Sequence, residues 1–116
     1  MEDCIFCKII NKSIPADIIY EDDELVAFRD LHPLAPVHIL IIPKEHISTI
    51  DDLESRHEKV AGKMILTAKK IARNEKISEG GYKLLFRVKK HGGQEVDHIH
   101  LHLIGGAMLA EGIHTI

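Results

Sequence analysis

The chain has 116 residues, 45% of them hydrophobic and 28% charged, an ordinary composition for one globular domain that buries its own core. A formal net charge of -3 leaves no basic surface for nucleic acid, and the longest purely apolar run, residues 39–42, is far below the ~20 residues of a membrane-spanning helix. The N-terminus is acidic where a signal peptide is basic. We therefore expect a single domain over residues 1–116, located in the cytoplasm, with no nucleic-acid or membrane partner.

The N-terminal part of the chain predicts a short helix and three strands. Apolar pairs with i, i+4 spacing, such as Ile5 and Ile9, favour a helix. The acidic residues 21–24 connect two short strand-like segments and are typical of an exposed hairpin turn. An almost wholly apolar segment between Pro36 and Pro43 predicts a strand in the centre of a sheet. The expected elements are a helix over residues 4–11 and strands over residues 18–20, 25–29 and 38–42.

The C-terminal part predicts a long helix and two further strands. From Asp51 onward, apolar residues recur with helical spacing: Leu53, Val60, Met64, Ala68, Ile71 and Ala72. Glycine pairs then mark breaks between elements, at residues 80–81, 92–93 and 105–106. We expect the first pair to end the helix, a strand over residues 82–88, and a last strand in the histidine-rich segment. Together these elements predict an α+β fold with about five antiparallel strands and a helix on one face.

The last predicted strand contains three histidines, His98, His100 and His102, at alternate positions. Side chains two residues apart in a strand share a face, so we expect the three imidazoles in one row and the apolar residues between them facing the core. The pattern alone fits three interpretations: an exposed polar face, a metal site with an open coordination position, or a metal-free phosphoryl- or nucleotidyl-transfer site. In the last, one imidazole attacks phosphorus and a neighbour protonates the leaving group.

The loop before these histidines, residues 91–96, contains two glycines that permit close backbone approach. We therefore expect its N–H groups to bind phosphate oxygens. The loop lacks the Lys-Ser/Thr ending of a P-loop, and the chain contains no G-x-G-x-x-G. The residues alone thus predict a histidine-based site, with phosphate as one candidate ligand.

Several ordered motifs together resemble those of one family. They are CIFCKIINKSIPADIIYEDDELVAF near the N-terminus, D-x-x-P-x-A-P-x-H over residues 30–38, PKEHI over residues 43–47, and GGQEVDHIHLHLIGG. On these motifs, over nearly its whole length, the chain resembles the histidine triad (HIT) family, in the branch of small nucleotide hydrolases often called HINT. The resemblance implies a homodimer with the sheet extended across both subunits. It also implies binding of purine mononucleotides such as AMP and hydrolysis of nucleoside 5′-phosphoramidates.

The same resemblance assigns catalytic roles. His100 would be the nucleophile that carries a covalent nucleotidyl intermediate, His102 would contact the phosphate and the leaving group, and His98 would support the row. His38 would lie close to these rings, the alternative being a satisfied core histidine. The reaction would require no metal or other cofactor.

Nucleotide-binding residues carry over in the same way. Asp30 would accept hydrogen bonds from the ribose hydroxyls, for which a carboxylate is well suited. The base would be surrounded by Ile5, Phe6, Ile9, Phe28 and Leu31, and the phosphate bordered, mostly through backbone groups, by Gln94, Glu95 and Val96. The alternative for the apolar set is ordinary core.

Three departures from the family pattern bear on specificity. Arg87 stands where relatives commonly have Asn, so a polar contact near the phosphate changes in size and charge, and Arg87 either strengthens phosphate binding or points away. Glu95 stands where some relatives have Ser. The tail, residues 107–116, lacks the Trp-Pro-Pro-Gly ending of eukaryotic relatives, which helps to set leaving-group specificity, so the preferred amine stays open.

Cys4 and Cys7 have C-x-x-C spacing, and in a reducing compartment such thiols remain available as metal ligands. Certain relatives bind structural zinc through a C-x-x-C and two histidines, which here would be Cys4, Cys7, His46 and His98. The alternative is a pair of small buried residues under the first helix. Two other functions also stay open: a zinc-dependent hydrolase that uses the histidine row as ligands, and a non-catalytic nucleotide- or partner-binding module.

Overall fold

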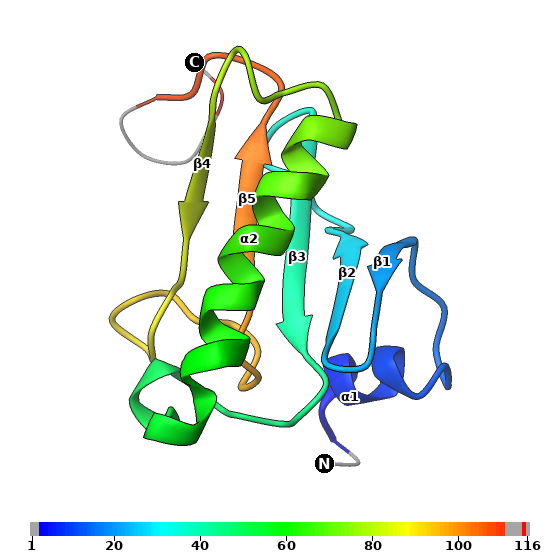
Figure 1. Cartoon of the computed structure of the whole chain (residues 1–116), viewed down its shortest axis with the longest axis vertical. Helices are drawn as coiled ribbons and strands as arrows, with labels where there is room; N and C mark the ends of the chain where they lie inside the picture. The colour runs from blue at the N-terminus through cyan, green and yellow to red at the C-terminus, as the bar shows by residue number, and fades with distance from the viewer. Residues whose placement is uncertain (1–2, 111–114, 116) are drawn as a thin grey trace.

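The computed structural model describes residues 3–110 and 115 and contains one five-stranded antiparallel sheet in the order β1-β2-β3-β5-β4 (Figure 1). The strands are β1 Ile18–Glu21, β2 Leu25–Arg29, β3 Val37–Pro43, β4 Tyr82–Leu85 and β5 Leu101–Gly105. The helices are α1 Ile5–Ile10 and α2 Glu58–Asn74, with short 3₁₀ turns η1 Ile50–Asp52 and η2 Ser55–His57 before α2. No helix in the described ranges has the length and apolar character needed to cross a membrane. The predicted α+β class and five-stranded sheet are confirmed.

Each face of the sheet packs into its own core because side chains alternate along the strands. Ile39 of β3 lies opposite Leu103 of β5, and both belong to the core beneath α2, which crosses this face in Figure 1. Leu40 lies opposite His102 and points to the other side, where it packs in the same core as Phe6 of α1. We call the side beneath α2 the first face and the side of His102 the second face.

The strands that flank the glycine loop are shorter than predicted. β4 ends at Leu85 instead of residue 88, and β5 begins only at Leu101, so the first two histidines of the row precede the strand. The loop explains both differences, because the Gly92 N–H bonds back to the carbonyl of Val88 (3.2 Å) and the segment folds into turns that leave the ladder. α2 likewise begins late, at Glu58, because the two 3₁₀ turns occupy the start of the helical pattern.

α2 ends at Asn74, before the glycines at residues 80–81 that we expected to end it. Lys76 adopts φ 62°, and the Ile77 N–H returns to the carbonyl of Ala72 (3.0 Å). This is a Schellman-type cap, built on a lysine where glycine is usual. Ile77 is buried in the core under α2, which supports the reversal of the chain.

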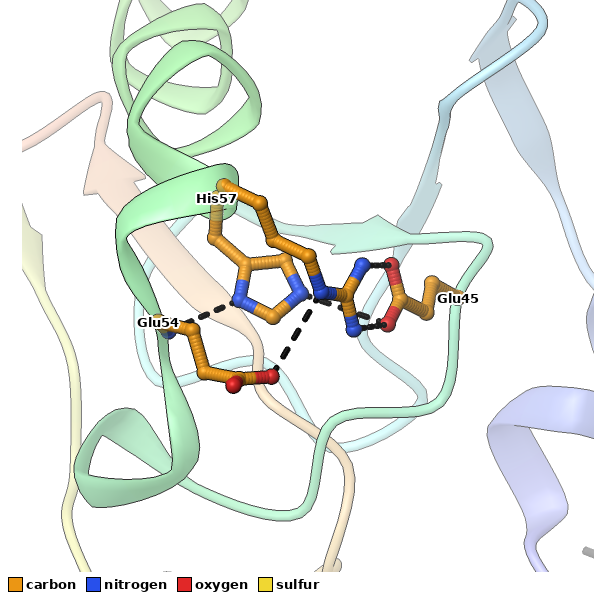
Figure 2. A network of polar contacts seen from close by, with 4 residues as sticks. Glu45, Glu54 and His57 are labelled. Carbon is orange, nitrogen blue, oxygen red and sulfur yellow. Dashed lines mark hydrogen bonds and ion pairs between the residues drawn. The ribbon is translucent and has the colours of Figure 1, made fainter.

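One buried histidine outside the row belongs to the turn that starts α2. His57 Nδ1 accepts a hydrogen bond from the Glu54 N–H (2.9 Å), and its Nε2 lies 3.2 Å from Glu45 Oε2 (Figure 2). Arg56 binds both carboxylate oxygens of Glu45, and Arg56 and His57 together lower the pKa of this carboxyl to about 2. His57 therefore ties the loop after β3 to the start of α2.

Candidate active site

The three histidines of the row, His98, His100 and His102, are buried on the second face of the sheet. The ring centroids of His100 and His102 are 4.9 Å apart, and Phe6 contacts His98 and His100 edge-on at centroid distances of 5.8 and 5.0 Å. The apolar residues between them belong to the core of the first face. The predicted alternation is confirmed, although only His102 lies within β5.

A single hydrogen bond determines which nitrogen of His100 is free. Its Nδ1 lies 2.7 Å from the carbonyl oxygen of His98. A carbonyl accepts and cannot donate, so the ring proton is on Nδ1 and Nε2 keeps its lone pair. Burial lowers the pKa of His100, which keeps the ring neutral at neutral pH. His100 therefore presents an unprotonated nitrogen, as a nucleophile requires.

A chain of hydrogen bonds that starts at the backbone orients His102. The Leu34 N–H donates to His38 Nδ1 (3.1 Å), which leaves the His38 proton on Nε2, 3.0 Å from His102 Nδ1. His102 then carries its own proton on Nε2, a buried atom with no hydrogen-bond partner among the described residues. Burial lowers the pKa of His102 to about 3 and also lowers that of His38. The site thus holds an unpaired N–H donor beside an unprotonated nitrogen.

The residues predicted to bind the nucleoside lie at the end of β2 and around α1. Asp30 Oδ1 accepts the His32 N–H (2.8 Å), and Oδ2 lies 3.5 Å from His38 Nε2, so this carboxylate adjoins the histidines. Three of the five apolar residues, Phe6, Ile9 and Phe28, are buried in the core of the second face. The other two are exposed, Ile5 to 46% and Leu31 to 84%. The exposed pair is accessible to a ligand, whereas the buried three form part of the fold.

The glycine loop offers fewer backbone donors than we expected. The N–H groups of Gly92, Gly93 and Gln94 are bound within the loop, to carbonyls of residues 88–90. The turns of the loop satisfy these three amides, so the prediction that the loop binds phosphate through its N–H groups now rests on the other residues of the loop, such as Glu95 and Val96.

Gln94, Glu95 and Val96 have different surroundings. Gln94 Nε2 donates to the carbonyls of Ser48 (2.6 Å) and Val96 (2.9 Å), so this side chain holds the loop in place. Val96 packs against the core of the second face, and Glu95 is exposed. The Glu95 charge acts to raise the pKa of His100 against the larger effect of burial. Glu95 and Val96 therefore lie next to the histidine row.

The predicted zinc ligands lie together at one end of the row. Single ligand atoms from Cys4, Cys7, His46 and His98 are all within 4.8 Å of one another. The His98 Nε2–H donates to the Pro43 carbonyl (2.8 Å), which leaves Nδ1 as a lone pair 3.4 Å from Cys4 Sγ and 3.6 Å from Cys7 Sγ. His46 Nδ1 lies 3.4 Å from Cys7 Sγ.

These distances fit zinc. Tetrahedral zinc, with Zn–S of about 2.3 Å and Zn–N of about 2.0–2.1 Å, places sulfur and nitrogen about 3.6 Å apart. Without metal the same atoms can share S–H···N hydrogen bonds, and burial together with the Cys4 thiol raises the pKa of Cys7 to about 11. Metal binding therefore has to displace thiol protons.

Comparison with known proteins places this geometry in a family. Residues 3–115 match the family model described as scavenger mRNA decapping enzyme C-term binding. The chain is 54% identical over 108 residues to a purine nucleoside phosphoramidase of Escherichia coli (strain K12), covering 93% of this chain and 91% of that protein. A HIT family hydrolase from Legionella pneumophila Philadelphia 1 superposes with a TM-score of 0.93 at 48% identity, covering 95% and 98% of the two chains. The chain belongs to the histidine triad family of hydrolases.

A second solved structure supports the same family assignment. A histidine triad protein from Clostridium difficile superposes with a TM-score of 0.92 at 38% identity, covering 95% of this chain and 96% of that one. The predicted resemblance to the purine nucleoside phosphoramidase branch of the family is confirmed.

The triad is not arranged as three ligands of one metal ion. The ring nitrogens of His98 face Pro43 and the cysteines, and His100 Nδ1 is bound to a carbonyl. Within the described part of the chain, the other set of ligand atoms within 4.8 Å is Asp30, His38 and His102, which excludes His100. A zinc hydrolase that uses the triad as ligands, one of the alternatives from the sequence, is therefore wrong for this arrangement.

Sequence reasoning missed the backbone groups that orient the triad. The Leu34 N–H sets the tautomer of His38, and the Pro43 carbonyl sets that of His98. The prediction used Pro43 only as the end of a strand and gave Leu34 no role. Neither contact can be read from residue types, because every residue has a backbone carbonyl and nearly every residue an N–H.

Proposed function

We propose that this triad hydrolase cleaves the P–N bond of purine nucleoside 5′-phosphoramidates. The observation that carries the proposal is the pair of ring tautomers: His100 has a bare Nε2, and His102 has an unpaired Nε2–H, on the same buried face. A nucleophile beside a hydrogen-bond donor is the arrangement that displacement at phosphorus needs. The E. coli relative, which is 54% identical, is named for this activity.

In the first step, His100 Nε2 attacks the α-phosphorus. The new N–P bond forms as the P–N bond to the amine breaks, which gives a covalent nucleotidyl-histidine. The His102 Nε2–H donates to the phosphoryl group and the departing nitrogen, and the amine takes the proton that it needs from solvent as it leaves. The His98 carbonyl, which accepts the Nδ1–H of His100, stabilises the positive charge that develops on the attacking ring.

In the second step, water attacks the same phosphorus. The proton that the water loses passes to solvent, the bond from phosphorus to His100 Nε2 breaks, and the nucleoside monophosphate leaves. Two displacements thereby replace one more difficult reaction. Neither step as proposed uses a metal ion or another cofactor.

We assign the nucleoside to the rim formed by the end of β2 and α1. Asp30 Oδ2, beside His38, accepts from the ribose hydroxyls. The exposed Ile5 and Leu31 contact the purine, with Phe6, Ile9 and Phe28 in the core behind them. Glu95 and Val96 border the phosphate, and Gln94 holds their loop.

Single-turnover hydrolysis of adenosine 5′-phosphoramidate after metal chelation tests this proposal. We expect the wild type to turn over and to form a nucleotidyl-protein adduct visible by mass spectrometry. His100→Ala should lose the adduct and about 10⁴-fold or more in rate. His91→Ala, which removes an exposed imidazole from the adjoining loop, is the matched control and should react like the wild type.

Three results would contradict the proposal. Full activity in His100→Ala would remove the nucleophile, and loss of wild-type turnover on chelation would make the chemistry metal-dependent. AMP binding without turnover would favour a nucleotide-binding module instead.

We further propose that Cys4, Cys7, His46 and His98 hold a structural zinc ion. The protein fills all four positions, which is the pattern of structural zinc. The ion would join α1, the loop after β3 and the segment before β5, three regions far apart in the sequence. It would thereby hold His98, whose carbonyl orients His100.

We propose a homodimer in which β4 pairs with β4 of a second copy. β4 is an edge strand, and an exposed strand edge offers unpaired N–H and C=O groups. Ile65 and Leu66 of α2 are 51% and 63% exposed, and Ile65 lines an apolar hollow together with Phe86, just after β4. Strand pairing would cover this apolar surface.

We propose a cytoplasmic location and no nucleic-acid or membrane partner. Cys4 and Cys7 are free thiols, which fits a reducing compartment. The net charge of -3 argues against a nucleic-acid surface.

A further inference from the structure

Arg87 lies two residues beyond β4, between that strand and the glycine loop. Leu85, the last residue of the β4 ladder, is paired with His102, and Arg87 follows it by two residues, close enough to the site for its charge to act on His38, His100 and His102. A Cβ atom on Gly93 would lie 2.9 Å from Arg87 Nη1, so the guanidinium rests against the bare backbone of this glycine. Arg87 is half-buried there.

The Arg87 guanidinium has no hydrogen bond or ion pair with any other residue that the structure describes. By contrast, Arg29 is paired with Glu75, and Arg56 with Glu45. The Arg87 charge still reaches the site, since it adds to the effect of burial in lowering the pKa of His38, His100 and His102.

The charges around His100 make this cation important. The rings of the site are neutral, and the two other charged residues that act on His100, Asp30 and Glu95, are both negative. A phosphoryl group approaching His100 would be repelled by these carboxylates unless a cation offsets them. A guanidinium has five N–H donors and no acceptor, and its planar fork matches two phosphate oxygens.

We propose that Arg87 is a catalytic residue of the triad site, which donates to the anionic oxygens of the α-phosphoryl group and stabilises the negative charge that builds up as His100 attacks. This inference rests on the proposed function and deepens it. Because the negative charge of the nucleotide lies on its phosphoryl oxygens, the cationic guanidinium of Arg87 binds these oxygens and not the uncharged nucleoside. Gly93 leaves room beside it, since a Cβ atom there would displace the end of the Arg87 side chain from this position.

The test compares AMP with adenosine, which lacks the phosphate. Dissociation constants from calorimetry and kcat/KM for adenosine 5′-phosphoramidate are measured for the wild type, Arg87→Gln and Arg87→Lys. Lys90→Gln is the matched control, because it removes one positive charge from an exposed position of the same segment. Urea unfolding midpoints establish that each variant is folded.

We expect Arg87→Gln to bind AMP about 10- to 100-fold more weakly, as for loss of a charged hydrogen bond, and adenosine as the wild type does. kcat/KM should fall at least as far, Arg87→Lys should recover part of the loss, and Lys90→Gln should change neither constant. Unchanged AMP affinity in Arg87→Gln, or an equal loss for AMP and adenosine, would overturn the inference.

The proposed function can fail separately. If the wild type binds AMP through Arg87 and does not hydrolyse the phosphoramidate, then Arg87 remains a phosphate-binding residue and the phosphoramidase proposal falls. A wild type that binds neither AMP nor adenosine would overturn both.

Discussion

We expect His38→Leu to change the orientation and protonation of His102 while leaving the nucleophile His100 in place. The His38 ring accepts from the Leu34 N–H (3.1 Å) and donates to His102 Nδ1 (3.0 Å). Leucine fills a similar volume but leaves both of these groups without a partner. Each unsatisfied buried group costs about 1–3 kcal/mol, so we expect a loss of about 2–4 kcal/mol in the free energy of unfolding after partial relaxation.

The chemical effect should be larger than a loss of stability alone would produce. Without a donor at its Nδ1, His102 can take its proton there and present a lone pair at Nε2, where phosphate needs an N–H. We expect kcat/KM to fall about 10- to 100-fold, in the range for misplaced acid–base groups. His38→Gln offers an acceptor and a donor on a side chain of similar length and should recover much of both losses.

Two measurements test this reasoning together. Urea unfolding gives the stability change, and ¹⁵N chemical shifts of the His102 ring report which nitrogen carries the proton. The reasoning is refuted if His102 keeps its proton on Nε2 in His38→Leu, or if His38→Leu and His38→Gln lose the same activity.

Three further predictions concern metal, pH and assembly. Cys4→Ser should lose about one zinc ion per chain by elemental analysis and melt several degrees lower; an unchanged melting temperature after chelation of the wild type would contradict this. The folded pKa of His102, about 3, lies below the ~6.5 of an unfolded histidine, so its neutral ring stabilises the fold above pH 6.5 and loses this effect as pH falls. Urea midpoints should therefore drop less from pH 7 to 4 in His102→Gln than in the wild type, and parallel curves would rule this out. Leu66→Glu should sediment as a monomer where the wild type is a dimer.

The two faces of the sheet were predictable because burial follows side-chain periodicity. Leu103 and His102 are neighbours in sequence and face opposite cores, as alternation in a strand requires. Boundaries were less predictable wherever a backbone conformation ended an element. Lys76 follows α2 in a left-handed conformation that is usually adopted by glycine, so the sequence predicted the helix end at the glycines of residues 80–81 instead.

The candidate site was predictable in its residues and not in its orientation. The motifs identified His38, His98, His100 and His102, and the structure brings all four together. Which nitrogen is free on His38, His98 and His100 depends on single backbone atoms, which leave no trace in residue identity, and His102 follows from His38. The same holds for the loop, where the N–H groups of Gly92, Gly93 and Gln94 bond to carbonyls of their own turns, which the residue types did not indicate.

The carbonyl of His98 has a consequence for mutational studies of this site. It is the acceptor that orients His100, yet it belongs to the main chain and survives every side-chain replacement at position 98. Alanine scanning would therefore register the loss of the His98 ring and overlook the contact with His100. A backbone ester at the 98–99 linkage would reveal it, by weakening the carbonyl as an acceptor, and would also remove the Ile99 N–H that bonds to Ile47 (2.7 Å). One peptide unit thus joins the geometry of the nucleophile to the packing of the loop after β3.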